Sequence, residues 1–245
     1  MLPISASDAR KLVDDEDFPP RFFINQIVRR RLVSRAFTPA GRAWFIRDWH
    51  FSAMTLQRDE DNSILGIIIT GDDLKYSNIN EITNRIVKSA HLCQHPLFPI
   101  VVAADGALED YRELSDELLV NSEDVHHSLG LPFKYEGARR LKHVSQDPAT
   151  SLTNLINERE RLIRLAGDTK AFYASTKTLL DLKHTASSVS MSGVSAGKST
   201  SEINDSIEAM LEYLVAASQD ILERVAATDA RMQMLFASVS NSVKT

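Results

Sequence analysis

Residues 193–200, Gly-Val-Ser-Ala-Gly-Lys-Ser-Thr, are of the types that cradle phosphate groups. A phosphate-binding loop has four residues between its two glycines, so that the backbone can curl around the phosphates. Here three residues separate Gly193 from Gly197, and no strand-like run precedes them. The sequence therefore favours a Ser- and Gly-rich linker, with nucleotide binding as the alternative, and we assign no cofactor-binding residue.

The histidines have spacings that could suit a metal. His91 and His95 are four residues apart, which places two imidazoles on one face of a helix. The zincin pattern needs a glutamate directly after the first histidine, and Leu92 stands there instead. His126 and His127 are adjacent and point to different helix faces. We interpret these histidines as structural, and any metal ligand stays unknown.

Nucleophilic catalysis finds little support in the sequence. Cys93 is the only cysteine, so it has no partner for an intramolecular disulfide, and it falls on the apolar stripe of an expected helix. No Gly-x-Ser-x-Gly elbow is present. We predict no catalytic residue and lean against an enzyme, with an unrecognised active site as an alternative. The single cysteine and the absence of a signal peptide pattern favour a cytoplasmic location.

Two charged stretches could bind a partner. Five carboxylates form an acidic helix face, which we expect to be solvated: Glu109, Asp110, Glu113, Asp116 and Glu117. Residues 21–47 contain seven arginines with interleaved aromatic residues, a combination that could hold phosphates or stack on bases. These arginines could equally pair with the acidic helix face. The net charge of −5 favours that second interpretation, so no nucleic-acid partner is expected.

The elements that would position these residues change in character along the chain. Residues 44–56 and 64–70 are strand-like and are joined by a polar turn at 57–63, which predicts a hairpin. The second run is apolar on both faces, so we expect a buried central strand. Helical spacing follows at residues 79–93 and 108–125, with Pro96 and Pro99 as breaks between the two. Residues 130–150 read as a loop.

The C-terminal part is dominated by long helices. Residues 151–185 predict one helix, and residues 185–201 a flexible linker. Beyond it, positions step by four and three over more than four heptads, the pattern of a coiled-coil seam. We assign partner binding to the apolar members of this seam: Ile207, Leu211, Leu214, Ile221, Val225, Met232, Leu235 and Val239. The two long helices are expected either to pair antiparallel or to pair with another chain.

Together these patterns predict an α+β, mostly helical protein. A small β-sheet packed by helices would occupy an α/β domain of residues 1–145. A helical hairpin or coiled-coil stalk would occupy residues 146–245. The composition, with 43% hydrophobic and 25% charged residues, is that of a globular protein. The sequence has no apolar run of about 18 residues, so no membrane span is expected.

Three blocks of the sequence resemble a known family. Residues 43–48, Ala-Trp-Phe-Ile-Arg-Asp, with the strand at 63–69, resemble the Pro-Trp-Ser-Ile-Arg-Gln block of fungal CorA-like transporter-domain proteins. Residues 95–99, His-Pro-Leu-Phe-Pro, resemble a block that opens a helix in that family. Residues 223–241 resemble its long stalk helix.

The resemblance implies a cytosolic α/β part with stalk helices, followed in the family by two membrane helices and a Gly-Met-Asn motif. This chain has neither, and Thr245 falls about where the first membrane helix would begin. We therefore expect a non-catalytic CorA-like protein that acts through helix-mediated association, with itself or with a helical partner. The alternative is the cytosolic part of a divalent-cation transporter, membrane-associated, for which the resemblance alone suggests Mg²⁺.

Overall fold

The computed structural model describes residues 33–38, 41–70, 75–128, 148–190 and 198–242. The protein is α+β and mostly helical, as the sequence predicts: in the described residues, a four-stranded antiparallel sheet precedes two short and three long helical elements. Packing divides the chain into two compact units that do not follow chain order. The first consists of Met1–Asp110 and Ala171–Ser218, the second of Tyr111–Lys170 and Gln219–Thr245. The expected domain boundary at 145/146 lies outside the described residues.

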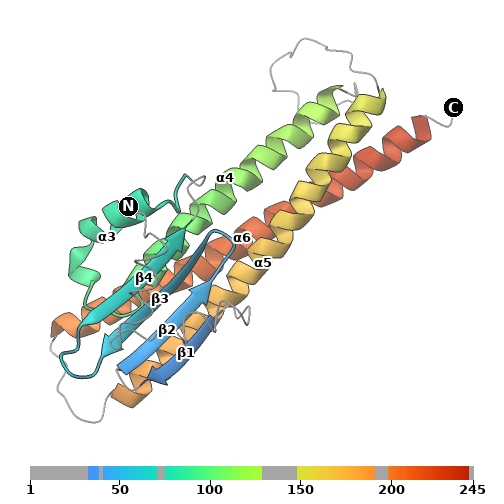
Figure 1. The fold of residues 1–245 in the computed structure, drawn as a ribbon. Coiled ribbons are helices and arrows are strands. Elements are labelled where there is room, and N and C mark those ends of the chain that lie inside the picture. The colour runs from blue at the N-terminus through green and yellow to red at the C-terminus, as the bar shows by residue number, and fades with distance from the viewer. Residues whose placement is uncertain (1–32, 39–40, 71–74, 129–147, 191–197, 243–245) are drawn as a thin grey trace. The chain divides into compact units, whose positions relative to one another are not determined.

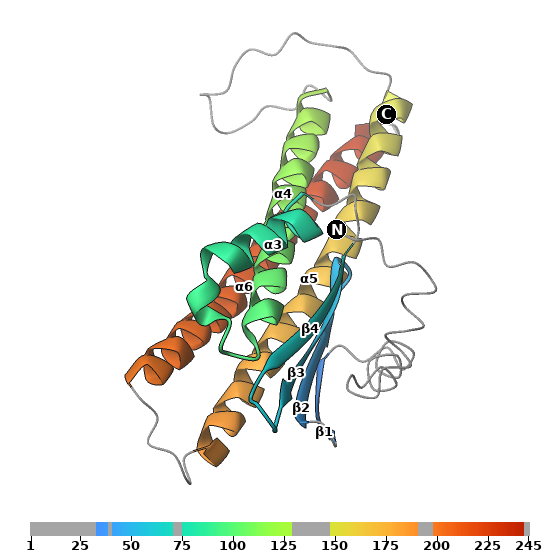
Figure 2. The ribbon, with the colours of Figure 1, turned by 60° about the vertical axis from the view of Figure 1, so that its left-hand side comes forward.

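The sheet of the first unit contains strands β1 (Val33–Thr38), β2 (Gly41–Arg47), β3 (Phe51–Arg58) and β4 (Ile64–Thr70), paired in that order. In both ribbon views it lies alongside the part of α5 that belongs to this unit (Figures 1 and 2). Strand β2 is buried on both faces, since Ala43, Trp44, Phe45 and Ile46 are consecutive and each at most 3% exposed. Strand β3 is buried in the same way, with residues 53–56 all 0% exposed.

The structure corrects the strand prediction in three respects. The strand-like run 44–56 is divided between β2 and β3 by a tight turn. There the backbone amide of Asp48 donates to the Phe51 carbonyl (2.8 Å), and the Asp48 carboxylate accepts from the His50 amide (3.1 Å). Strand β1 was missed within the arginine-rich stretch. Finally, β4 is an edge strand of the described sheet rather than a central one, with Ile69 49% exposed.

Short helical elements connect the sheet to the long helices. Helix α3 (Ile79–Lys88) begins after Asn78, whose side chain accepts from the Glu81 amide, and a 3₁₀ turn, η1, covers Ala90–Leu92. Helix α4 (Phe98–Ser128) starts ten residues earlier than its apolar spacing indicated. Pro99 does not break it, because a proline in the first turn of a helix lacks only an amide that would be unpaired there anyway.

The second unit contains parts of α4, α5 (Pro148–Ser190) and α6 (Lys198–Ser242). Ion pairs at the borders of their buried faces show the direction of each helix. Glu117 of α4 pairs with Arg161 of α5 (2.8 Å), while Asn121 contacts Glu158 (3.2 Å), so these helices run antiparallel. Arg159 of α5 pairs with Asp229 of α6 (3.0 Å).

Helices α4 and α6 run parallel in this unit, because Asp116 pairs with Arg224 (3.6 Å) and Glu123 with Arg231 (3.8 Å), seven residues further along both helices. The unit is thus an up-down-up bundle of three helices. The expected antiparallel pairing of the two long C-terminal helices is confirmed. In addition, α5 extends to Ser190 and α6 begins at Lys198, so both ends of the predicted linker are helical; residues 191–197 lie outside the described part.

Candidate functional site

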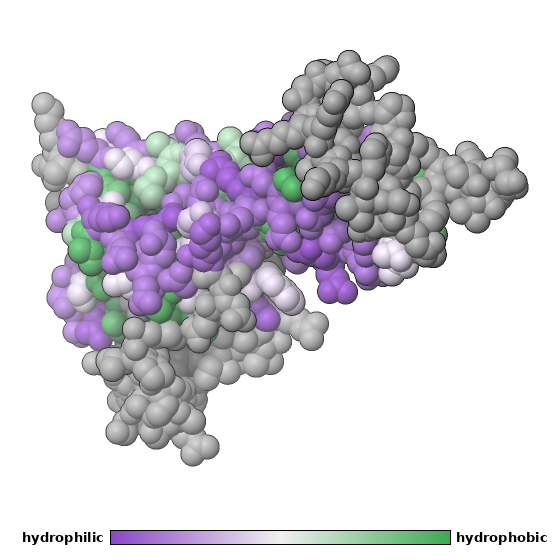
Figure 3. All heavy atoms as spheres, turned by 90° about the horizontal axis from the view of Figure 1, so that it is seen from above, coloured by the Kyte–Doolittle hydropathy of each residue, from purple (hydrophilic) through white to green (hydrophobic). Residues whose placement is uncertain are grey.

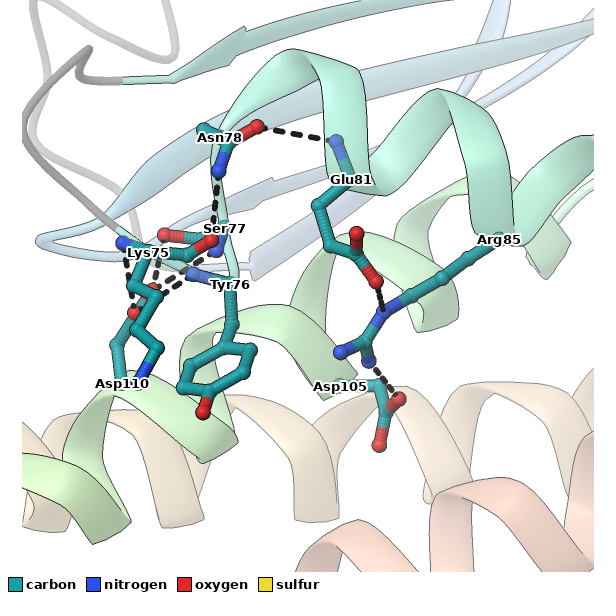
Figure 4. A network of polar contacts seen from close by, with 8 residues as sticks. All are labelled: Lys75, Tyr76, Ser77, Asn78, Glu81, Arg85, Asp105 and Asp110. Atoms are coloured by element: carbon teal, nitrogen blue, oxygen red, sulfur yellow. Dashed lines mark hydrogen bonds and ion pairs between the residues drawn. The ribbon is translucent and has the colours of Figure 1, made fainter.

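A network of polar contacts surrounds Asp110 on α4 (Figure 4). Its Oδ1 accepts the backbone amides of Lys75 (3.2 Å) and Tyr76 (2.9 Å), and its Oδ2 accepts the amide (2.9 Å) and the hydroxyl (2.5 Å) of Ser77. One turn earlier on α4, Gly106 packs against the same segment. A Cβ on Gly106 would lie 2.6 Å from the Tyr76 carbonyl oxygen. The segment 75–77 is therefore held in close contact with α4.

The same network fixes α3. The side-chain nitrogen of Asn78 donates to the Lys75 carbonyl (2.6 Å). The side-chain oxygen of Asn78 accepts from the Glu81 backbone amide (3.0 Å) and so caps the helix. Near the other end of α3, Arg85 donates to Glu81 (3.1 Å) and also pairs with Asp105 of α4. Polar contacts thus tie both ends of α3 to α4, as Figure 4 shows.

A histidine, His50, lies near Asp110 and Ser77 of this cluster. It is 7% exposed, and burial lowers its pKa, while the negative charge of Asp110 acts in the opposite direction. Serine, aspartate and histidine are the residue types of a hydrolytic triad, which requires the serine to donate to the histidine. Here Ser77 donates to Asp110 instead and is 0% exposed. Because no substrate could reach that hydroxyl, we interpret the network as structural.

The sequence prediction for Asp110 was wrong. We expected it on a solvated acidic face, but it is 7% exposed. Asp110 follows Ala107 by three residues and Ala103 by seven, so helical periodicity places it on the buried apolar face. That spacing was the signal in the sequence. Asp116 and Glu117, also on the expected acidic face, pair with Arg224 and Arg161 of the long helices.

A second polar cluster of the first unit joins α5, α6 and the segment before α4. Lys183 of α5, with a side chain only 5% exposed, pairs with Glu208 of α6. Burial, and secondarily the Lys183 cation, lowers the pKa of His95 to about 4. The Nδ1 of His95 accepts the Leu97 amide (3.1 Å) just before α4 begins. His95 is therefore a neutral, structural side chain, as interpreted from the sequence.

His91 does not share this environment: it is exposed and lies at a cleft. The cleft has a volume of about 410 Å³ and is lined by His91, Leu92, Gln94, Glu202, Ile203 and Ser206. Cys93 is partly buried. Within the described residues, no three histidine, cysteine or acidic side chains gather as metal ligands would. The phosphate-loop-like residues 193–197 and the side chain of His127 lie outside what the structure describes.

The heptad seam of α6 is buried within the single chain. Exposed fractions do not exceed 6% for Ile207, Leu211, Leu214, Ile221, Val225, Met232 and Leu235, nor for the polar seam positions Ser218 and Thr228. The side chain of Val239 lies outside the described set. Packing within the chain already covers this seam, so a second chain would have to displace α4 or α5 to reach it. Binding of a partner by the seam stays a prediction.

No helix among the described residues is long and apolar enough to cross a membrane. The comparisons with known proteins identify no family: no protein-family model matches this chain, and no curated protein matches its sequence.

Proposed function

We propose that this chain is a non-catalytic, cytoplasmic CorA-like protein that acts through association of its long helices. The observation that carries the proposal is the outer side of α5 in the three-helix unit. There the apolar side chains of Ile156 and Ile163 are 43% and 56% exposed. The two residues are seven positions apart and so lie on one side of α5.

The polar side chains of the bundle support the non-catalytic part of the proposal. Arg159 and Arg161, which flank this side of α5, are engaged with Asp229 and Glu117. Their charges therefore stabilise the register of the bundle rather than forming a reactive site. Apart from the grey atoms, the face shown in Figure 3 is mostly hydrophilic, with hydrophobic residues in small separate patches.

The sequence blocks behind the family resemblance lie in strands and helices, or directly before a helix. Residues 43–47 lie in β2 and residues 64–69 in β4. Residues 95–99 lead into α4, and residues 223–241 lie in α6. At about 1.5 Å per residue, the 45 residues of α6 extend over roughly 68 Å. This length is what supports the second candidate, the cytosolic part of a divalent-cation transporter with a stalk helix.

The test is the mass of the chain in solution, measured by light scattering over a range of concentrations. We expect oligomers, and we expect Ile156→Glu with Ile163→Glu to reduce them, because a partner would have to bury both charges. Val120→Glu, at a 54% exposed apolar position of α4, is the matched control. A chain that is monomeric at every concentration would contradict the proposal.

Two further experiments test the transporter candidate and the partner-binding role of the seam. Oligomers that form only with MgCl₂ would favour the transporter candidate. Substituting the seam, as in Leu214→Asp with Ile221→Asp, tests the seam prediction, but both side chains are 1% exposed. Circular dichroism must therefore show that this variant still folds before its mass is interpreted.

A further inference from the structure

One exposed side of α5 has the spacing of a helix-pairing seam. Its members follow one another at intervals of three and four residues, as the positions of a coiled-coil seam do. All of them are exposed, and we call them the α5 stripe: Thr153, Ile156, Glu160, Ile163 and Gly167. The stripe lies in the part of α5 that belongs to the second unit, and it is separate from the face that buries Leu155 and Leu162.

The packing of the chain does not account for Gly167. A Cβ at this position would meet no atom within 4 Å, and the φ of this residue is not positive. Glycine is less favourable than alanine in the interior of a helix, and nothing within the chain requires it here. A glycine does leave bare backbone that a neighbouring helix can approach closely. Gly167 therefore suits a contact with another molecule, next to two exposed isoleucines.

The spacing of the α5 stripe allows a second copy of α5 to pair with it in antiparallel direction. When Ile156 of one copy packs on Gly167 of the other, Glu160, four residues later, faces Ile163, four residues earlier on the second helix. A two-fold axis repeats both contacts with the copies exchanged. The bare backbone of each stripe thus receives a large apolar side chain from the other.

Charge favours the same register. Arg164 is exposed and directly follows Ile163, at the border of the stripe. With Ile156 on Gly167, Glu160 of each copy lies beside Arg164 of the other, and opposite charges meet twice across the axis. Placing Ile156 on Ile163 instead would bring the two Glu160 carboxylates almost directly opposite each other, and a parallel pair would do the same. Such like-charge contacts are costly. Close packing and charge therefore select one register independently.

We propose that the partner of the long helices is a second copy of this chain, bound through an antiparallel pair of α5 stripes. In this pair Ile156 packs on Gly167 of the other copy, and Glu160 pairs with Arg164 of the other copy. The proposal rests on the helix-mediated association proposed above and specifies its partner and register. Because the same surface is used by both copies, the contact closes on itself and produces a dimer.

Disulfide crosslinking of the full chain tests the register. On a Cys93→Ser background, a chain with Ile156→Cys is mixed with a chain with Gly167→Cys and oxidised with copper phenanthroline. We expect covalent mixed dimers on a non-reducing gel, because facing residues bring the two Cα atoms within reach of a disulfide. Each variant alone should crosslink weakly, since its equal positions lie eleven residues, or about 16 Å, apart along the pair. Absence of the mixed dimer, or stronger crosslinking between Ile156→Cys and Ile163→Cys, would overturn the proposal.

Sedimentation velocity over a range of concentrations tests the close approach at Gly167. Gly167→Leu should raise the Kd of the dimer about tenfold or more, because the leucine fills the space that Ile156 of the second copy occupies. Gly167→Ala adds one methyl group and should change the Kd little. Asn154→Leu is the matched control, since Asn154 is exposed on another side of the same helix. A Kd that Gly167→Leu leaves unchanged would count against the packing of Ile156 on Gly167.

A charge exchange gives a further readout. Glu160→Arg and Arg164→Glu should each raise the Kd about tenfold when present alone, because like charges then meet across the pair. Mixed in equal amounts, the two variants should dimerise about as well as the unchanged chain, since each copy supplies the charge that the other requires. A mixture that dimerises no better than its components would contradict the ion pairs.

Failure of the register and failure of the association itself give different results. Dimers that depend on Ile156 and Ile163 but lack the crosslink between positions 156 and 167 would leave the association standing and refute this register. A chain that is monomeric at every concentration would refute both.

Discussion

The backbone of Tyr76 rests directly on Gly106: a Cβ at residue 106 would lie 2.6 Å from the Tyr76 carbonyl oxygen and 3.1 Å from the Ser77 Cα. Both are main-chain atoms of residues whose amides donate hydrogen bonds to Asp110. Neither atom can move away from residue 106 without weakening those hydrogen bonds. The glycine is what permits the segment before α3 to lie on α4.

Gly106→Ala should therefore destabilise the protein, although alanine is the better helix former. An overpacked contact of this kind costs about 1–3 kcal/mol, which exceeds the gain in helix propensity of about 1 kcal/mol. The free energy of unfolding in urea measures the effect.

Gly167 is the matched control, since it lies in the interior of α5 and a Cβ there would meet nothing within 4 Å. Gly167→Ala should raise the unfolding free energy by about 1 kcal/mol. Equal effects from the two substitutions would show that the close approach at Gly106 is not a constraint.

Removing the Asp110 carboxylate should be more costly. Asp110→Ala leaves three backbone amides and the Ser77 hydroxyl without their acceptor in a buried site, and we expect a loss of about 3 kcal/mol or more. Thermal unfolding followed by circular dichroism measures it. Asp124→Ala removes an exposed carboxylate from the same helix and should change stability by less than about 0.5 kcal/mol. Similar losses in both variants would place Asp110 on the surface after all.

His95 should make the stability of the protein depend on pH. Its pKa in the folded chain is about 4, against an ordinary value of 6.5, so the unfolded chain binds the proton first as the pH falls. Stability is then full above about pH 6.5 and declines toward pH 4, by roughly 3 kcal/mol for this residue.

His95→Asn should flatten that decline, since an asparagine oxygen can still accept the Leu97 amide and does not titrate in this range. Urea unfolding at several pH values between 4 and 7 is the measurement. His91→Asn, at an exposed histidine four residues earlier, should keep the wild-type slope. An unchanged slope in His95→Asn would assign the pH dependence to other groups.

Removing one partner of the Lys183–Glu208 pair should lower the unfolding free energy more than replacing both partners with apolar residues. Glu208→Ala deprives a lysine that is 4% exposed of its carboxylate, and we expect a loss of about 3 kcal/mol. The double change Lys183→Met with Glu208→Leu removes both charges and should restore most of that loss. Unfolding free energies of the single and double variants check this, and a double variant as unstable as the single one would contradict it.

The long helices and the buried seam could be recognised from the sequence because they depend on local spacing. Residues such as Leu211 and Ile221 recur every three or four positions, and this periodicity alone predicts a helix with one buried face. The direction of α5 and α6 was left open by the sequence, which allowed them either to pair antiparallel or to pair with another chain.

Local spacing does not predict which surface covers the seam, because the same apolar face can pack against a helix of its own chain or of another chain. In this chain it packs within the molecule. Likewise, the apolar run of β4 determined a strand but not its place in the sheet, which depends on how many strands pair beside it. The tight turn at Asp48 was hidden because the run on either side is continuous in strand-forming residues.

Asp110 shows the same division. The sequence alone determined a carboxylate on α4, whose charge normally favours solvent. Tertiary structure decided that it is buried, because the chain following β4 returns to α4 and presents three amides and a hydroxyl there. Helical periodicity depends on residues that are close in the sequence. The donors to this carboxylate are 33 to 35 positions away and reach it only when the chain has folded.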